Sequence, residues 1–241
     1  MIRKDIGKLL AENTYPGRGI VIGMAKGGLS ALIAYFIMGR SENSRNRIFE
    51  AFEGGLRTKA FDESKMADPS LIIYNAFRTA GDTDIVTNGD QTDTIYEFIR
   101  KKPDCEFAFE HALFTREFEP DAPNYTPRIS GLVRYDKKGG FNYKLSVLKS
   151  AGGDPSACDR FFYNYTPVEG RGHFIHTYLK DGNPIPSFSG EPEEVFMPET
   201  ADEFAGIIWN NLNSENKVSL FVRAVPLNGG KPAEIIINKN K

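Results

Sequence analysis

Cysteines and long apolar runs are scarce in this chain of 241 residues. Its two cysteines, Cys105 and Cys158, lie in unlike contexts, which excludes a disulfide framework and is typical of a reducing compartment. The longest apolar run, Ala31 to Met38, has the length of a strand and is far shorter than the roughly 18 residues that cross a bilayer. The opening MIRKDIGKLLAEN includes acidic residues and lacks the apolar core of a signal peptide. We therefore predict a cytoplasmic protein with no membrane partner.

An excess of charge of either sign is also missing. Lys and Arg number 30 against 32 Asp and Glu, so the formal net charge is −2. A broad electrostatic surface for nucleic acid is therefore not expected, and any bound anion must be met by a local cluster of basic residues. Hydrophobic residues make up 40% of the chain and charged residues 26%, as in ordinary folded proteins. The length favours one domain.

Strand patterns dominate the chain, and its expected helices are grouped. Apolar runs rich in β-branched and aromatic residues, separated by glycine-rich turns, predict strands over 19–23, 30–38, 71–79, 83–87, 128–135, 141–149, 160–165, 172–179, 218–225 and 234–237. Helices are expected up to Asn13, over 92–102 and 104–117, and from a capping box at Thr200. Because helices and strands do not alternate, we predict an α+β fold of antiparallel sheets with helices packed outside them.

Two motifs that suggest chemistry have simpler interpretations. The glycine-rich stretch 23–30, GMAKGGLS, lacks the Gly-Lys-Ser/Thr ending of a phosphate-binding loop and is followed by a strand, so we interpret it as a hairpin loop. His173 and His176 lie three residues apart on an expected strand and so face opposite sides, which does not suit a shared metal. We predict no metal site.

The local basic cluster that the charge balance requires lies in YFIMGRSENSRNRIF, residues 35–49. An apolar strand leads there into three arginines and an asparagine within eight positions: Arg40, Arg45, Asn46 and Arg47. A guanidinium matches phosphate oxygens bidentately, and serine or asparagine can complete the shell. The alternative is a solvated loop in which the arginines pair with acidic neighbours, namely Glu42, Glu50 and Glu53. Composition alone favours neither interpretation.

Polar groups at strand and helix ends are further candidates for a site. Tyr74 and Asn75 lie within an apolar expected strand, where buried polar groups need either a structural network or a ligand. Asn88 and Thr92 lie in a turn that leads into a helix N-terminus, which suits an anion or simple capping. Arg128 follows a proline at the start of a strand, where it would meet a ligand or form a surface ion pair.

Five short motifs occur in a fixed order along the chain. They are Tyr15-Pro16-Gly17-Arg18-Gly19, Arg40-Ser41 through Asn46-Arg47, Tyr74-Asn75, Asn88-Gly89 through Ile95, and Thr126-Pro127-Arg128-Ile129. In this order they resemble the archaeal-type IMP cyclohydrolase family. The resemblance covers about residues 15–130 and returns more loosely at 200–213. An N-terminal helix, two extra residues in the arginine loop and a longer C-terminal half depart from that pattern.

The resemblance implies a fold and a reaction. The fold is a four-layer αββα sandwich like that of N-terminal-nucleophile (Ntn) hydrolases, without their autocatalytic nucleophile. It implies a single domain over 1–241, with 1–14 as a helical extension, and association into a homo-oligomer. The reaction is closure of 5-formamidoimidazole-4-carboxamide ribonucleotide (FAICAR) to IMP with loss of water in purine biosynthesis, which requires no cofactor.

The resemblance also assigns roles to residues. Tyr74 and Arg128 would polarise the formyl oxygen, and Asn75 and Asn88 would orient the carboxamide. The residues expected to bind substrate and phosphate are Arg40, Arg45, Asn46, Arg47, Asn88 and Thr92. Two alternatives stay open: a purine-nucleotide-binding paralogue without the cyclising chemistry, and an amidohydrolase acting on a related formamide or lactam.

Overall fold

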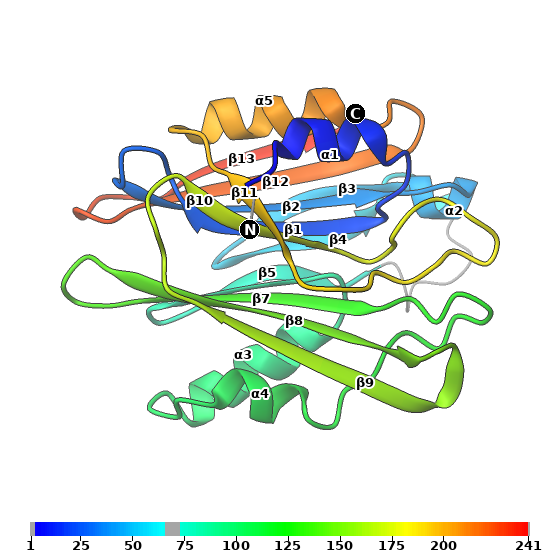
Figure 1. Cartoon of the computed structure of the whole chain (residues 1–241), viewed down its shortest axis with the longest axis horizontal. Coiled ribbons are helices and arrows are strands. Elements are labelled where there is room, and N and C mark those ends of the chain that lie inside the picture. The colour runs from blue at the N-terminus through cyan, green and yellow to red at the C-terminus, as the bar shows by residue number, and fades with distance from the viewer. Residues whose placement is uncertain (1–2, 66–72, 241) are drawn as a thin grey trace.

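Two antiparallel sheets stack against each other in the computed structural model, which describes residues 3–65 and 73–240 (Figure 1). The first sheet has the strand order β11 (Glu193–Phe196), β10 (Arg171–His176), β1 (Arg18–Met24), β2 (Ser30–Met38), β12 (Lys217–Pro226) and β13 (Ala233–Asn238). The second runs in chain order through β3 (Arg47–Phe52), β4 (Gly55–Ala60), β5 (Asn75–Ala80), β6 (Thr83–Thr87), β7 (Arg128–Tyr135), β8 (Phe141–Ala151) and β9 (Asp154–Tyr165). The predicted α+β class with antiparallel sheets is confirmed.

Helices cover the outer faces of the two sheets (Figure 1). Helices α1 (Ile6–Glu12) and α5 (Ala201–Asn211) lie on the first sheet, and α3 (Gln91–Lys101) and α4 (Ala108–Leu113) lie on the second. Two short helical turns, α2 (Glu42–Arg45) and Glu63–Lys65, belong to connections. Among the described residues, no helix is long and apolar enough to span a membrane.

Side chains alternate between the two faces of each strand and so belong to different parts of the hydrophobic core. On β1, Ile20 and Ile22 belong to the cluster between the sheets, whereas Val21 packs toward α1 and α5. Because both faces of β1 are buried, its sequence is a continuous apolar run, and a slip of one residue would exchange its side chains between the two clusters. His173 and His176 of β10 also lie on opposite faces of the sheet, as predicted. The His173 ring stacks on Tyr165, which packs against the cluster between the sheets, whereas the His176 ring stacks on Phe174, which belongs to the cluster under α1 and α5.

Element ends follow local sequence signals in most places. The Thr200 hydroxyl accepts the backbone N–H of Glu203 at the start of α5, which confirms the predicted cap. The expected helix over 104–117 was too long, because α4 spans only Ala108–Leu113. Tertiary contacts end it early: the Arg116 guanidinium pairs with Asp90, and the chain then turns away toward Glu119.

A hairpin within 47–60 was not predicted. Charged residues in RIFEAF and GLRTKA interrupt the apolar runs, yet β3 and β4 pair over their whole length. The expected strand 71–79 begins only at Asn75 within the described residues, and 71–72 lie outside them.

Several strands of both sheets begin or end on the same side of the molecule. Arg18, which begins β1, pairs with Ile37 near the end of β2, and Gly19 pairs with His176 at the end of β10. In the second sheet the start of β7 lies beside the end of β6, through the pair Ser130 and Thr87. Loops from distant parts of the sequence therefore meet at these strand ends.

Candidate active site

A cavity of about 360 Å³ opens where these strand ends meet. Three arginines line it: Arg18 begins β1, Arg40 follows β2 and Arg47 begins β3. Two carboxyl groups, those of Glu119 and Asp121, enter from the connection between α4 and β7. The other lining residues are Tyr15, Met38, Ser41, Asn43, Ser44, Asn124, Tyr178 and Ile185. The cavity is therefore polar, and both basic and acidic side chains line it.

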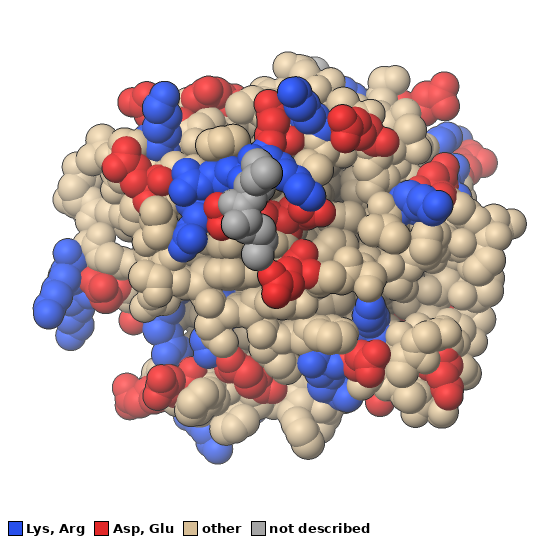
Figure 2. Space-filling model, viewed as in Figure 1, with Lys and Arg blue, Asp and Glu red and all other residues tan. Residues whose placement is uncertain are grey.

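This concentration of charge is local. On the face shown in Figure 2, basic and acidic side chains are interspersed over the surface. That distribution agrees with the balanced net charge of −2.

Arg47 is held rigidly in the cavity wall. It is 2% exposed, and its Nε and Nη2 atoms donate to the carbonyls of Ser44 (2.8 Å) and Met38 (3.2 Å). A capping box between Ser41 and Ser44 forms the turn α2 that presents the first of these carbonyls. Burial lowers the pKa of Arg47, and the nearby Arg18 guanidinium lowers it further. Two like charges at one wall favour an anion beside them.

Arg18 has free donors. Its side chain makes no hydrogen bond or ion pair with any described residue, and its Nε is buried without a partner. Burial lowers the pKa of Arg18, but the Glu119 carboxylate and nearby tyrosines outweigh burial and raise it above its usual value. A guanidinium whose buried Nε has no partner is suited to an anionic ligand.

Gly17 lets this arginine sit close to Tyr178. Its φ is +78°, and a Cβ there would lie 2.2 Å from the Thr177 hydroxyl and 2.5 Å from the Tyr178 ring. Only glycine therefore fits.

Glu119 is the buried carboxyl of the cavity. It is 4% exposed, and its backbone N–H donates to the Thr126 carbonyl at 2.9 Å. Burial raises its pKa; Arg18 and Arg128 oppose the shift, which remains upward overall. A carboxyl group with a raised pKa in a cavity is the type of group that donates and accepts protons near neutral pH.

Tyrosine hydroxyls near Arg18 take part in two separate sets of hydrogen bonds. The hydroxyls of Tyr35 and Tyr74 are 2.7 Å apart, and burial raises the pKa of Tyr35. The Tyr178 hydroxyl lies 2.6 Å from that of Thr126, whose single proton goes to Asp121, so Tyr178 is the donor to Thr126. Burial raises the pKa of Tyr178 to about 12. The phenols of Tyr35 and Tyr178 therefore remain neutral near neutral pH.

The structure brings some of the predicted site residues to this cavity. Arg40 and Arg47 line it, whereas Tyr74 lies behind its wall, bonded to Tyr35. Arg40 is engaged by the Asp181 carboxylate (2.5 Å) and the Gly182 carbonyl (2.9 Å).

Arg128 does not line the cavity but lies near enough to Glu119 for its charge to act on that carboxyl group. Its Nη1 donates to Gln91 Oε1 and pairs with Asp90, both at 2.7 Å. Its charge also opposes the rise in the pKa of Glu119. Arg128 is therefore placed to influence the cavity by charge and not by contact.

The remaining predicted residues bond to their own neighbours and do not line the cavity. Asn46 makes two hydrogen bonds with the backbone of Asp62, and Asn88 holds both Pro127 and Ile129. The other bonds run from Arg45 to Gly39 and Asn216, from Thr92 to Thr87, and from Asn75 to Asp93. Their direct contact with substrate stays a prediction.

The alternative of a solvated arginine loop describes this segment only in part, because Arg40 and Arg45 are exposed whereas Arg47 is buried. Within the described residues, the cluster arginines make no ion pair with Glu42, Glu50 or Glu53. Sequence reasoning missed Glu119, whose only signal is its place in the irregular, proline-rich stretch FEPDAPNYTP.

A family model described as "IMP cyclohydrolase-like protein" matches residues 15–229. The chain belongs to the IMP cyclohydrolase-like protein family. All cavity residues, from Tyr15 to Ile185, fall within the match.

Curated relatives named IMP cyclohydrolase match parts of the chain. The relative from Methanosphaera stadtmanae is 31% identical over 125 residues, which is 52% of this chain and 60% of the relative. Those from Methanococcus aeolicus and Haloquadratum walsbyi are each 29% identical, over 116 and 119 residues. These two cover 48% and 49% of this chain and 56% of each relative. The chain thus spans about 60% of the length of the curated relatives it matches.

Proposed function

We propose that this protein closes FAICAR to IMP with loss of water. The observation that carries the proposal is the buried carboxyl group of Glu119 in an arginine-lined cavity, within a chain of the IMP cyclohydrolase-like family. The cavity volume of about 360 Å³ falls in the range of small-molecule sites. A purine nucleotide is the ligand that this chemistry suits.

The three arginines supply the phosphate site in this proposal. Arg18 has unused donors, and Arg47 is fixed by two carbonyls. Arg40 exchanges the Asp181 carboxylate for a phosphate oxygen. Charge-assisted bonds from guanidinium to phosphate are short and strong, so three of them hold one end of the substrate.

Ring closure then depends on position and proton transfer. The carboxamide nitrogen forms a bond to the formyl carbon, the formyl oxygen becomes a hydroxyl group, and this hydroxyl leaves as water. Holding the two groups in near-attack geometry contributes up to roughly 7–11 kcal/mol. Protonated Glu119 donates to the formyl oxygen as the C–N bond forms, and its carboxylate takes the proton that the carboxamide nitrogen loses. Glu119, protonated again in this way, then protonates the departing hydroxyl, while the former formamide N–H gives up its proton to the Glu119 carboxylate as the C=N bond forms. Tyr74 acts through the Tyr35 hydroxyl, and Arg128 through its charge near Glu119.

The remaining predicted residues position this machinery in the proposal. Asn88 holds the segment that carries Arg128, Asn75 holds Asp93 on α3, and Thr92 closes the first turn of that helix. Asn46 and Arg45 shape the arginine segment through Asp62 and Gly39.

We also propose that the two sheets and their outer helices form the Ntn-hydrolase-like αββα sandwich, as one domain over 1–241 with 1–14 as an extension. Helices on both outer faces and a continuous core between the sheets support this. A cytoplasmic location and a homo-oligomer belong to the same proposal.

The test is to mix the purified protein with FAICAR and follow the ultraviolet change as the purine ring forms. We expect ring closure well above the uncatalysed rate. Thermal stabilisation by IMP without turnover would instead indicate a nucleotide-binding paralogue. Release of formate from a related formamide, without closure of FAICAR, would indicate an amidohydrolase.

A further inference from the structure

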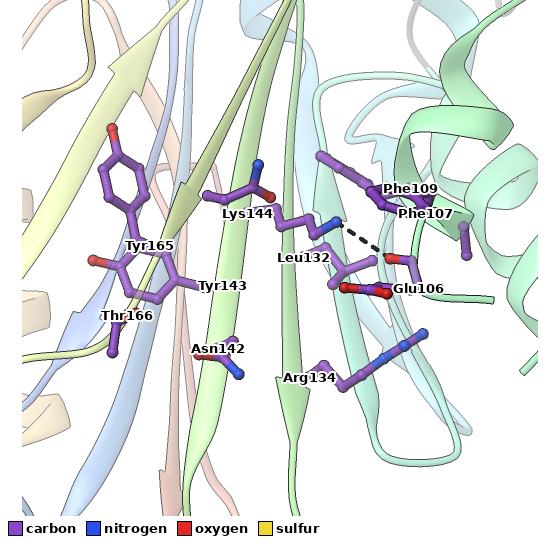
Figure 3. Close-up of a pocket in the computed structure, with 12 residues that line it drawn as sticks. Glu106, Phe107, Phe109, Leu132, Arg134, Asn142, Tyr143, Lys144, Tyr165 and Thr166 are labelled. Atoms are coloured by element: carbon purple, nitrogen blue, oxygen red, sulfur yellow. Dashed lines mark hydrogen bonds between the residues drawn. The ribbon is translucent and has the colours of Figure 1, made fainter. Parts of the chain in front are cut away.

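A second cavity, of about 400 Å³, lies on the outer face of the second sheet beside the start of α4 (Figure 3). It shares no lining residue with the candidate active site. Leu132, Arg134 and Lys144 extend from β7 and β8 toward the α4 side, whereas the rings of Tyr143 and Tyr165 point the other way (Figure 3). Phe107 and Phe109 supply apolar surface.

Arg134 is unusual among the arginines of this chain. Within the described residues, three arginine side chains make no hydrogen bond or ion pair: Arg18, Arg100 and Arg134. Arg100 is exposed on α3, but Arg18 and Arg134 each line a cavity with a buried, unpartnered Nε. Other arginines with an unpartnered Nε, such as Arg171, bond through their remaining nitrogens. A buried donor without a partner is costly, and a ligand would satisfy it.

The charges facing this cavity leave Arg134 unbalanced. Lys144 pairs with the Glu110 carboxylate at 2.7 Å and donates to the Glu106 carbonyl at 3.3 Å (Figure 3). Glu106, which is exposed at the cavity, is the acidic side chain of its lining. Arg134 therefore carries the charge that no direct ion pair compensates, which suits an anion of low charge.

Two amide side chains also line the second cavity. Asn142 is the cross-strand partner of Arg134, and Asn164 is that of Lys144. Cross-strand neighbours lie about 5 Å apart at Cβ, so the four groups form a compact polar patch. Both amides are exposed and make no side-chain hydrogen bond to another described residue. Each offers a donor and an acceptor, as the edge of a nucleobase requires.

We propose that this cavity binds a 5′-mononucleotide at a site separate from the candidate active site. Arg134 binds the phosphate, Asn142 and Asn164 bind the edge of the base, and the Phe107 ring, which is 55% exposed, packs on its face. Aromatic side chains stack on any base, so this wall supplies affinity and the amides supply selectivity. The site does not depend on ring-closure chemistry.

The probe is AMP, and the readout is hydrogen–deuterium exchange on the full chain. We expect AMP to slow exchange in peptides covering 104–110 and 141–145. Arg134→Gln removes this protection by weakening AMP about tenfold or more. The variant should fold normally because Arg134 makes no internal bond. Arg100→Gln, which replaces an exposed arginine that likewise makes no hydrogen bond or ion pair within the described residues, keeps the protection.

Two further arms define the ligand class. Adenosine and inorganic phosphate, each alone, are expected to protect these peptides less than AMP at the same concentration. Phe107→Ser is expected to weaken AMP but not phosphate. Equal protection in Arg134→Gln, protection confined to the first cavity, or phosphate acting as well as AMP overturns the proposal. Ring-closure activity enters none of these readouts, so the proposed function can fail independently.

Discussion

The two cavities of this molecule use arginine in different ways. In the first, the Arg47 guanidinium is buried, fixed by two carbonyls and accompanied by the buried carboxyl group of Glu119. In the second, Arg134 is free, and the carboxylate of Glu106 is exposed. Burial lowers the pKa of Arg47 and raises that of Glu119, and groups with such shifted pKa values cluster at reaction sites. The comparison indicates a reaction site in one cavity and a binding site in the other.

The largest effect should come from Glu119→Gln. The amide keeps the shape of the side chain but cannot exchange protons, so kcat for ring closure should fall by about 10²–10⁴-fold with little change in Tm. The control is Glu117→Gln, since Glu117 is 63% exposed two residues away. An active Glu119→Gln enzyme would remove the chemical distinction between the cavities.

Arginine replacements should separate binding from folding. Arg18→Gln removes a cation with no internal partner, so IMP affinity should fall by about 10–100-fold while Tm stays near wild type. Arg47→Ala should lower both, because it leaves the Ser44 and Met38 carbonyls without their donor. Calorimetry with IMP and thermal melts measure the two quantities. A large loss of Tm in Arg18→Gln would assign that arginine a structural role.

The pH dependence of the rate should report Glu119. Because burial raises its pKa, its proton-donating form persists above the usual range for a glutamic acid. The rate of ring closure should therefore fall as pH rises through that raised pKa and be level below it. Tyr178, with a pKa of about 12, adds no step near neutral pH. The same falling limb in Glu119→Gln would show that another group titrates.

The smallest effect concerns Arg40. Its partner Asp181 is 45% exposed, and such surface pairs contribute only about 0.2–1 kcal/mol. Asp181→Asn frees the guanidinium and should tighten IMP binding by about 1.5- to 5-fold, measured against Asp104→Asn on the exposed surface. Weaker binding would mean that the pair helps to form the phosphate site.

Much of the fold follows from local signals. The hairpin around 23–30 and the cap at Thr200 rest on residues close in sequence, and the strands of the second sheet follow one another in chain order. Arg40 and Arg47 also reach the cavity, as expected of phosphate ligands. The sequence does not predict the β3–β4 hairpin because charged residues break its alternation of apolar and polar positions. The predicted helix is longer than α4 because tertiary contacts, and not local sequence, set where α4 ends.

The site was harder to predict because it depends on contacts between distant segments. Arg45 and Arg47 look equivalent in sequence, yet Arg45 is exposed and bonds to Asn216, whereas Arg47 is buried at the start of β3. Glu119 stands in an irregular segment, and only the meeting of that segment with β1 reveals its burial beside Arg18. The spacing of residues along the sequence does not show which distant segments meet in the folded protein.

The most direct test of the central claim is a crystal structure of the protein with bound IMP. We predict that the phosphate lies within hydrogen-bond distance of Arg18, Arg40 and Arg47, with the carbon derived from the formyl group beside the Glu119 carboxyl group. IMP bound with its phosphate away from these arginines, or with its base remote from Glu119, would contradict the account.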